Sequence, residues 1–436
     1  MSEAKVRQGP PRHSRAFRLR RFANWFPLGL TYATFYMGRY NLYNANPELC
    51  KQFNWSNEQI GWIITAGFWT YALSLIFNGP LTDKIGGKRA MLIGAAGTVA
   101  MNLAIGVMLG LSGWPFKVLV TMAMLFAVNS YFQSFGAISI VKVNAHWFHV
   151  RERGVFGAIF GAMIQGGYYL AYGVGGFILV HLPLQYVFLI PSAAIAFMAL
   201  IDIFALKDTP QEAGFPELET HDASYGDDAP VDWGFIVKKI FTNPILITIA
   251  MAEFCTGFVR SGVLAWWTKY LDNVFQVGKD TAIFRFVATG IPLAGIAGGF
   301  ASGFLSDKVF GSRRPPVAFL FYCGQVLFLF VLAQAGSAWA AAALIVVVNF
   351  FINGVHGILS GTSSMDFGGR KGAASATGML DGCQYLAAGF VGFAMGRMLD
   401  ALGWGAWAYS IMGFAVIGAF LMTRLWRAVP SSAIKG

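Results

Sequence analysis

Charged residues are scarce in this chain of 436 residues, since Asp, Glu, Lys and Arg make up only 12% of it. Soluble domains are about one quarter charged, so these charges are too few to cover a soluble globule of this size. Hydrophobic residues make up 56% of the chain, and they collect in long runs. The composition excludes a soluble globule, a disordered chain, a collagen and a coiled coil, and it indicates an integral membrane protein.

Alternation of apolar and polar residues is also missing, and this argues against a membrane β-barrel. The chain instead has 40 Phe, 13 Trp and 52 Gly, many of them in unbroken apolar runs. Such runs favour packed helices, because Gly lets helix backbones approach closely. We therefore predict an all-α integral membrane fold.

Cysteine is rare, with neither a CxxC motif nor a His partner at metal-binding spacing, so we expect no disulfide framework and no zinc site. The GxSxG, HExxH and P-loop motifs are absent, and we expect neither an enzyme nor a cofactor. The net charge is +11, but Lys and Arg fall at the ends of apolar runs rather than on one face, so we expect no nucleic-acid partner. The four cysteines are Cys50, Cys255, Cys323 and Cys383.

The apolar runs are numerous enough to form two sets of six helices, each near the 20 residues that a spanning helix needs. A polar, acidic stretch from Lys207 to about Lys239 separates the sets and is predicted to be a loop. No small-residue cleavage site follows the basic N-terminus, so we expect the first run to remain as a helix. The runs lie near 24–46, 60–79, 91–111, 117–140, 155–179, 184–205, 244–270, 283–305, 316–336, 338–364, 373–397 and 404–425. The predicted domains are a basic segment 1–23, a six-helix bundle 24–206, a central loop 207–243, a second six-helix bundle 244–425 and a tail 426–436.

Lys and Arg are distributed unevenly between the two sides of this layout. About four of them lie on the side of the termini and the central loop for every one on the other side. Because cytoplasmic loops carry the excess of positive charge, both termini and the central loop are predicted to be cytoplasmic. The opposite side holds only Lys51, Lys117, Lys269, Lys279, Arg285 and Arg397.

Three landmarks recur in the second half of the chain, at offsets between 218 and 224 positions. GPLTDKIGGKR at 79–89 returns as GFLSDKVFGSRR at 303–314, and RERG at 151–154 as GRKG at 369–372. Arg39 in the first predicted helix corresponds to Arg260 in the seventh. Such repetition is typical of duplicated membrane proteins.

The repeated loop motif places an Asp at a helix end beside a cluster of basic residues. Such an Asp can pair with cations and face the terminal dipole of a neighbouring helix, and so latch helices in one conformation. The alternative is a solvated turn that carries topology signals, which two matched copies make less favourable. The predicted gating residues are Asp83, Lys88, Arg89, Asp307, Arg313 and Arg314.

The loop motifs, the six-plus-six layout and the long central loop resemble the major facilitator superfamily over essentially the whole chain. The resemblance implies two pseudo-symmetric six-helix bundles, with a substrate cavity between them that opens alternately to either side. It also implies a carrier rather than an enzyme.

A narrower resemblance is to the organophosphate:phosphate antiporters, the family of the glycerol-3-phosphate and hexose-6-phosphate transporters. YATFYMGRYN at 32–41 is similar to their first helix, and VRSGVLAWWTKYL at 259–271 to their seventh. DTPQEAGFP at 208–216 and RKGAASATG at 370–378 resemble further family segments. The implied substrate-binding residues are Arg39, Arg260, Tyr32, Tyr36 and Tyr385. Asp381, one turn before Tyr385, is a further candidate for substrate binding that the resemblance does not supply.

The residues themselves point to the same site. Tyr32, Tyr36 and Arg39 lie at i, i+4 and i+7, on one stripe of a helix. An Arg within a membrane helix costs at least about 2.5–3.5 kcal/mol on insertion scales, so it needs a functional reason. Two arginines converging on a central cavity supply two positive charges opposite the roughly two negative charges of a phosphate monoester, and guanidinium groups match phosphate geometry.

This chain also departs from the family pattern. Ile164 stands where the glycerol-3-phosphate branch has a histidine, and the stretch around Gln133 has lost a tryptophan and paired prolines. Acids lie inside the membrane instead, and each either pairs with an arginine or takes a proton. The candidate coupling residues are Glu253, Asp381 and His356; an ion pair that only neutralises the cavity is the alternative for the two acids.

Together these patterns predict a transporter that exchanges a phosphorylated organic anion for inorganic phosphate by alternating access. One alternative is a proton-coupled symporter of a carboxylate or phosphonate on the same fold. A further alternative is a membrane sensor of sugar phosphate that does not transport. We expect a monomer in the lipid bilayer of a plasma membrane, most simply a bacterial inner membrane.

The predicted orientation can be tested directly. A reporter fused after Gly436 and a protease site inserted near Asp227 should both be accessible from the cytoplasm, because the charge bias places the tail and the central loop there. Measurement of reporter activity and of cleavage in inside-out vesicles checks this. Opposite sidedness of the two probes would refute the layout.

Overall fold

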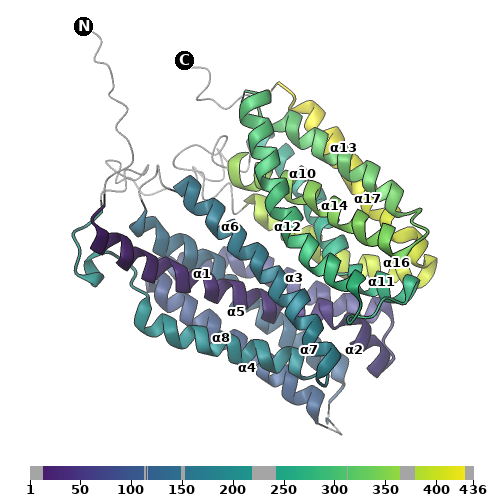
Figure 1. Ribbon diagram of the computed structural model, residues 1–436, viewed down its shortest axis with the longest axis horizontal. Helices are drawn as coiled ribbons and strands as arrows, with labels where there is room; N and C mark the ends of the chain where they lie inside the picture. Colours follow the sequence, from purple (N-terminus) through teal and green to yellow (C-terminus); the bar gives the residue numbers. More distant parts are fainter. Residues whose placement is uncertain are drawn as a thin grey trace.

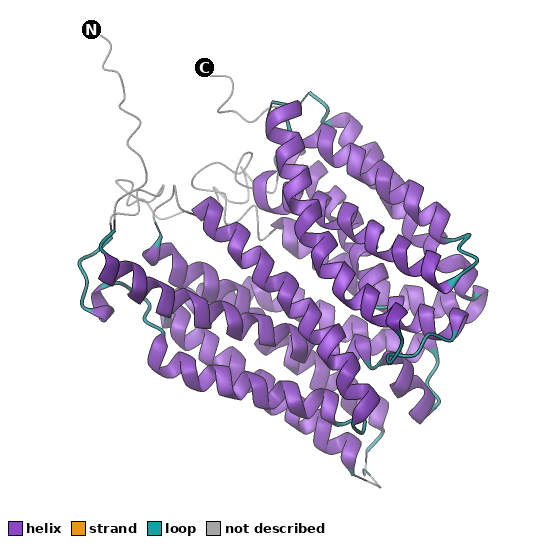
Figure 2. Cartoon of the chain, in the orientation of Figure 1, coloured by secondary structure: helices purple, strands orange, loops and turns teal. Residues whose placement is uncertain are grey.

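The computed structural model is helical in every part that it describes, with no strand there (Figure 2). Most of the central loop, the motif at 370–378, both chain ends, and the side chains of Asp83 and Asp307 lie outside the description. The described residues are 13–111, 114, 116–148, 153–218, 242–311, 313–363 and 379–427.

The helices form two groups, drawn in purple to teal and in green to yellow in Figure 1. The first group comprises α1 (Arg15–Asn44), α2 (Asn46–Phe53), α3 (Asn57–Ile85), α4 (Gly87–Gly110), α5 (Val118–Trp147), α6 (Arg153–Tyr169), α7 (Gly175–His181) and α8 (Tyr186–Ala205). The second comprises α10 (Pro244–Leu264), α11 (Trp267–Phe275), α12 (Ala282–Phe304), α13 (Arg314–Leu332), α14 (Ala338–His356), the helical stretch Met379–Leu402 that ends in α16 (Gly396–Leu402), and α17 (Trp407–Arg424).

The predicted number of membrane spans agrees with these helices. Among the residues described, 10 helical stretches are both long and apolar enough to cross a bilayer. Helices α1 and α3, with 30 and 29 residues, are longer than the roughly 20 residues that a span requires. With these two, the number of helices long enough to span a bilayer equals the twelve predicted.

Local sequence explains where several helices begin. Ser56 and Gln59 form a reciprocal capping box at the start of α3. Asn243 caps α10, whose first residue is Pro244, and Thr281 caps α12. These caps satisfy backbone N–H groups that have no partner inside their own helix.

Two predicted boundaries differ from the structure. The first helix begins at Arg15 rather than near residue 24, because the side chain of Ser14 accepts a hydrogen bond from the Phe17 N–H at 3.2 Å. The predicted run 244–270 is interrupted at Ala265 and Trp266, which separate α10 from α11. Apolar composition continues through this break, so hydrophobicity alone does not reveal it.

The internal repeat extends to backbone irregularities. A π-helical turn at Leu170–Val174 leads into α7, and a second at Val391–Met395 leads into α16. Both turns have 5 residues and both following helices have 7. The two six-helix bundles therefore share local distortions as well as sequence motifs.

The bundles approach most closely where α3 packs against Met379–Leu402. A Cβ atom on Gly61 would lie 2.2 Å from the Gly392 carbonyl oxygen, and one on Gly396 would lie 2.2 Å from the Asn57 carbonyl oxygen. The Thr65 hydroxyl donates to the Gly389 carbonyl at 2.7 Å and accepts from the Phe393 N–H at 2.9 Å. Glycine is required along this seam because the two backbones are in contact.

Polar contacts between the bundles concentrate at one end, which contains α2 and α11 and is called here the α2–α11 end. Lys51 pairs with Asp272 at 2.8 Å, and the Lys269 ammonium donates to the Cys50 sulfur at 2.9 Å. The Asp400 carboxylate accepts from the backbone N–H groups of Asn57 at 3.0 Å and Glu58 at 2.7 Å.

A further ion pair at this end joins Lys279 to Glu48. Burial lowers the pKa of Lys279, and Glu48 opposes that effect. At the opposite end, beside the junction of α3 and α4, Lys88 contacts Asp208 and the Ile203 carbonyl, both in its own half of the chain. The protein is therefore closed at the α2–α11 end.

The glycine seam predicts a specific stability effect. Gly392→Ala places a Cβ atom about 2.4 Å from the Thr65 hydroxyl oxygen and 2.5 Å from the Gly61 carbonyl oxygen, so the helices must separate. We expect a loss of about 1–3 kcal/mol, seen as a lower thermal unfolding temperature of the purified protein. The matched control is Gly413→Ala in α17, where a Cβ atom meets nothing within 4 Å and helix propensity should raise stability. Equal unfolding temperatures for the two variants would contradict the seam.

Candidate binding site between the two bundles

Arg39, in the middle of α1, is buried with 4% of its surface exposed. Its Nε–H donates to Gln133 Oε1 at 3.1 Å, and Gln133 is held in turn because its Nε2 donates to the Phe35 carbonyl at 2.9 Å. The guanidinium carbon lies 4.3 Å from the ring centre of Tyr71 and 5.2 Å from that of Tyr36. Both Nη atoms are buried without a hydrogen-bond partner in the described part of the chain. This arginine therefore keeps both Nη atoms available as hydrogen-bond donors in a buried environment.

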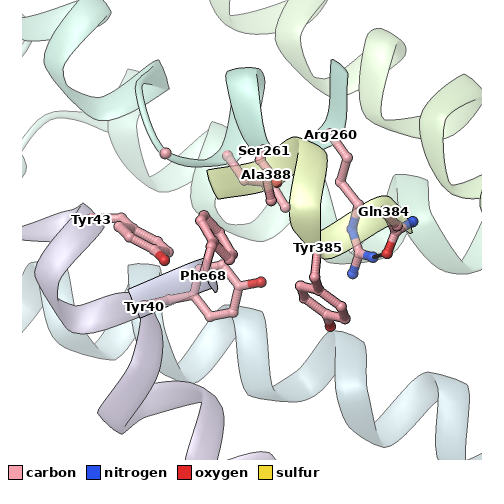
Figure 3. A pocket seen from close by; sticks show the side chains of 10 residues that line it. Tyr40, Tyr43, Phe68, Arg260, Ser261, Gln384, Tyr385 and Ala388 are labelled. Atoms are coloured by element: carbon pink, nitrogen blue, oxygen red, sulfur yellow. Dashed lines mark hydrogen bonds between the residues drawn. The ribbon is translucent and has the colours of Figure 1, made fainter. Parts of the chain in front are cut away.

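Arg260, in α10 of the second bundle, is also buried, with 9% of its surface exposed. Its Nη2 donates to the Tyr168 hydroxyl at 2.7 Å. Its Nη1 donates to Gln384 Oε1 at 3.2 Å, and Figure 3 shows these two side chains together. Tyr168 belongs to α6 in the first bundle, so this hydrogen bond crosses between the bundles. Among the described residues, no ion pair involves Arg39 or Arg260.

Tyrosine rings fill the space between the two arginines. The Tyr36 ring, which contacts Arg39, packs edge-on against Tyr168 with ring centres 4.9 Å apart, and Tyr168 bonds to Arg260. The hydroxyls of Tyr40 and Tyr168 are 3.1 Å apart. On the other side of Arg39, Tyr71 packs against Tyr385 with ring centres 4.7 Å apart. The environment is therefore rich in neutral hydroxyls and aromatic faces, which stabilise cations without cancelling their charge.

Next to Arg260, an acidic group is linked to the arginine through an amide. Glu253 is fully buried, and its Oε2 accepts from Gln384 Nε2 at 3.1 Å. His356 Nδ1 lies 2.8 Å from the same Gln384 nitrogen and 3.7 Å from Glu253 Oε2. Asp381 accepts a hydrogen bond from the Ser360 hydroxyl at 2.5 Å.

A small pocket opens between the bundles beside these groups. In Figure 3, Tyr40 and Tyr43 face it from the first bundle, while Arg260, Gln384 and Tyr385 face it from the second. Its remaining lining residues are Phe68, Ser261, Leu264, Ala265 and Ala388.

The fold brings the predicted binding residues into one region. Tyr32 packs against Tyr36 with ring centres 5.4 Å apart, which connects it to Arg39. Tyr385 lies in the pocket beside Arg260. The predicted coupling residues Glu253, Asp381 and His356 lie in the adjoining polar group around Gln384 and Ser360.

Sequence reasoning did not assign four residues that contact the arginines: Tyr71, Gln133, Tyr168 and Gln384. Gln384 offered a signal, because it precedes Tyr385 and lies one helical turn after Asp381. Tyr71 and Tyr168 lie in α3 and α6, whose apolar runs contain no pattern that singles them out. Their role depends on which helices become neighbours.

The predicted gating residues lie far from the pocket, at the end opposite α2 and α11. The Lys88 backbone N–H donates to Asp208 Oδ1 at 2.7 Å, and Arg314 donates to the Ser306 hydroxyl at 2.8 Å. Arg313 donates to the Phe310 carbonyl at 3.2 Å, and Arg89 is exposed. These contacts remain within one half of the chain. The side chains of Asp83 and Asp307 lie outside the described residues, so the latch stays a prediction.

Comparison with known proteins identifies the family of this chain and several similar transport and sensor proteins. Residues 28–392 match the family model described as Major Facilitator Superfamily. The probable hexose phosphate transport protein of Chlamydia pneumoniae is 25% identical, covering 94% of this chain and 92% of that protein. The glycerol-3-phosphate transporter of Bacillus subtilis is 24% identical, with 94% and 93% covered. The membrane sensor protein UhpC of Escherichia coli is 26% identical, with 90% and 89% covered.

Solved structures support the fold. A bacterial homologue of the human lysosomal transporter Spinster, in an inward-facing and occupied conformation, superposes with a TM-score of 0.75 at 14% identity, covering 96% of this chain and 98% of that one. Since the family model spans most of the sequence and the helices form two six-helix bundles, the chain belongs to the major facilitator superfamily, a family of transporters rather than enzymes.

Proposed function

We propose that this protein transports a phosphorylated organic anion across a plasma membrane in exchange for inorganic phosphate, by alternating access. The observation that carries the proposal is the pair of buried arginines, one from each bundle, of which Arg39 has both Nη atoms without a partner in the described structure. Two parallel N–H donors match two oxygens of a phosphoryl group, and a charge-assisted bond of this kind is strong in a dry site.

The relatives support this choice of anion. Proteins similar to this chain over most of its length are named for hexose phosphate, glycerol-3-phosphate and phosphoglycerate. These compounds share a phosphoryl group and differ in the organic part. The arginines are suited to the phosphoryl group, and the remaining residues of the site contact the organic part of the substrate.

Obligatory exchange has a physical basis in the same site. Reorientation of an empty carrier must move two buried arginines, neither of which forms an ion pair with a described residue, and this is unfavourable in a low-dielectric interior. A bound phosphoryl group compensates both charges, whether it belongs to the organic substrate or to inorganic phosphate. Either ligand therefore permits the conformational change that the empty site opposes.

The contacts between the bundles suit a carrier that alternates. Cross-bundle bonds such as Lys51–Asp272 close the α2–α11 end. With the orientation predicted from charge, this closed end faces away from the cytoplasm. We propose that the clusters around Asp83 and Asp307 close the cytoplasmic side in the alternate state. We also propose that the transporter is a monomer.

The arginine pair makes the first functional prediction. Arg39→Lys and Arg260→Lys each keep the charge but lose the two parallel N–H donors of the guanidinium group. Binding of phosphate and of substrate should therefore weaken about tenfold or more. Arg39→Ala and Arg260→Ala should abolish it. Titration of the purified variants measures this, with the exposed Arg285→Lys as the matched control. Affinity near that of the wild type in either alanine variant would reject the site.

Exchange itself is tested in proteoliposomes. Internal inorganic phosphate should stimulate uptake of a labelled organic phosphate, and liposomes without internal phosphate should accumulate little. Binding without any uptake would instead identify a sensor, in line with the name of the UhpC relatives.

Proton-coupled symport is a second candidate, and the contact of buried Glu253 with Gln384 and His356 favours it. Glu253→Gln removes the only carboxyl group in α10. It should therefore change the pH dependence of uptake more than the affinity for phosphate. Uptake measured from pH 5.5 to 8.5, with and without an imposed proton gradient, separates the two candidates. Exchange driven by phosphate alone, with an unaltered pH profile in the variant, would exclude proton coupling through Glu253.

A further inference from the structure

The site contains two carboxylates as well as two arginines, and both carboxylates belong to the second bundle. Glu253 projects from α10 beside Gln384. Asp381, Gln384, Tyr385 and Ala388 lie at i, i+3, i+4 and i+7, on one face of their helix. The last three line the pocket, so Asp381 lies one turn further along the pocket-lining face.

The hydrogen bonds of Gln384 define the charges around it. Its Oε1 accepts from Arg260, and the two hydrogens on its Nε2 are directed to Glu253 Oε2 and His356 Nδ1. The reverse orientation would place an N–H against a guanidinium donor. His356 therefore accepts at Nδ1 and carries its single proton at Nε2, as a neutral imidazole. The ionisable groups that remain are two cations, Arg39 and Arg260, and two acids, Glu253 and Asp381.

The site contains buried hydrogen-bond donors and a buried acceptor that lack partners among the described residues. Arg39 Nη1 and Nη2 are donor atoms without a hydrogen-bond partner among the described residues. The backbone N–H of Ser360 lies toward the Glu253 carboxylate, but Glu253 Oε1 has no hydrogen-bond partner in the described structure. A simple phosphate ester satisfies the Arg39 donors but leaves Glu253 Oε1 without a hydrogen-bond partner, which is costly for a buried polar atom. The site thus requires a donor as well as an acceptor from its ligand.

We propose that the preferred substrate is zwitterionic: a phosphate monoester or phosphonate that carries an ammonium group two or three carbons from the phosphoryl group. This inference rests on the proposed function and specifies its substrate class. The phosphoryl group binds Arg39 and Arg260, and the ammonium donates to Glu253 Oε1 and Asp381. The spacing is short because a single side-chain amide, that of Gln384, separates Arg260 from Glu253.

The test compares ligands that differ only in the amine. Dissociation constants are measured by titration calorimetry at pH 7 on the purified full-length protein, for 2-aminoethyl phosphate against ethyl phosphate and for 2-aminoethylphosphonate against ethylphosphonate. We expect each amino ligand to bind about tenfold or more tightly than its partner, since a charge-assisted hydrogen bond is gained. The ratio within each pair should fall to about one in Glu253→Gln and in Asp381→Asn.

The matched control is Asp202→Asn in α8. Asp202 is also a buried acid, but it accepts a hydrogen bond from Thr31 at 2.7 Å outside the cluster, so its loss should preserve the ratio. A wild-type ratio of one or less would overturn the inference while leaving the proposed function intact, provided that ethyl phosphate binds. An amine preference that survives in both Glu253→Gln and Asp381→Asn would also overturn it. Binding of neither member of either pair would reject the inference together with the proposed function.

Discussion

The arrangement of this protein depends on two guanidinium groups that are buried within a hydrophobic bundle. Each costs at least about 2.5–3.5 kcal/mol to place inside a membrane helix on insertion scales, and among the described residues neither forms an ion pair with a carboxylate. Arg39 is held by the Gln133 oxygen and two tyrosine rings, and Arg260 by the Gln384 oxygen and the Tyr168 hydroxyl. These partners are neutral, so they fix each side chain and leave its charge available to an anion.

Because each bundle supplies one arginine, an anion at the site links the two halves of the molecule. The hydrogen bond from Arg260 to Tyr168 already crosses between them. Glycine contacts between α3 and Met379–Leu402 let the backbones approach closely on the same side as the ion pairs of the α2–α11 end. A ligand that draws the arginines together therefore acts on a pair of rigid bundles that meet along a narrow seam.

The two halves have the same architecture but different chemistry. Tyr32 and Glu253 each precede the arginine of their own bundle by seven positions, so a phenol in one half corresponds to a carboxylate in the other. Gln165 and Gln384 are similarly related by the repeat, but Gln165 bonds to Asn353 while Gln384 joins Arg260 to Glu253. Duplication thus supplied the scaffold and the paired cations, and divergence placed the acidic groups on one side of the pocket.

The helices, their division into two bundles and part of the binding site were predictable from the sequence alone. Run lengths of about 20 apolar residues and the acidic central stretch determined the twelve helices and their division into two bundles, because a bilayer imposes these lengths. The spacing of Tyr32, Tyr36 and Arg39 determined that they share one face, because helical periodicity is local. Tertiary structure alone decided that Gln133, Tyr168 and Gln384 hold the arginines and that Tyr71 stacks on Arg39. These residues come from helices far apart in sequence, so no local pattern relates them, and only the packing of the bundles determines which side chains meet at the centre.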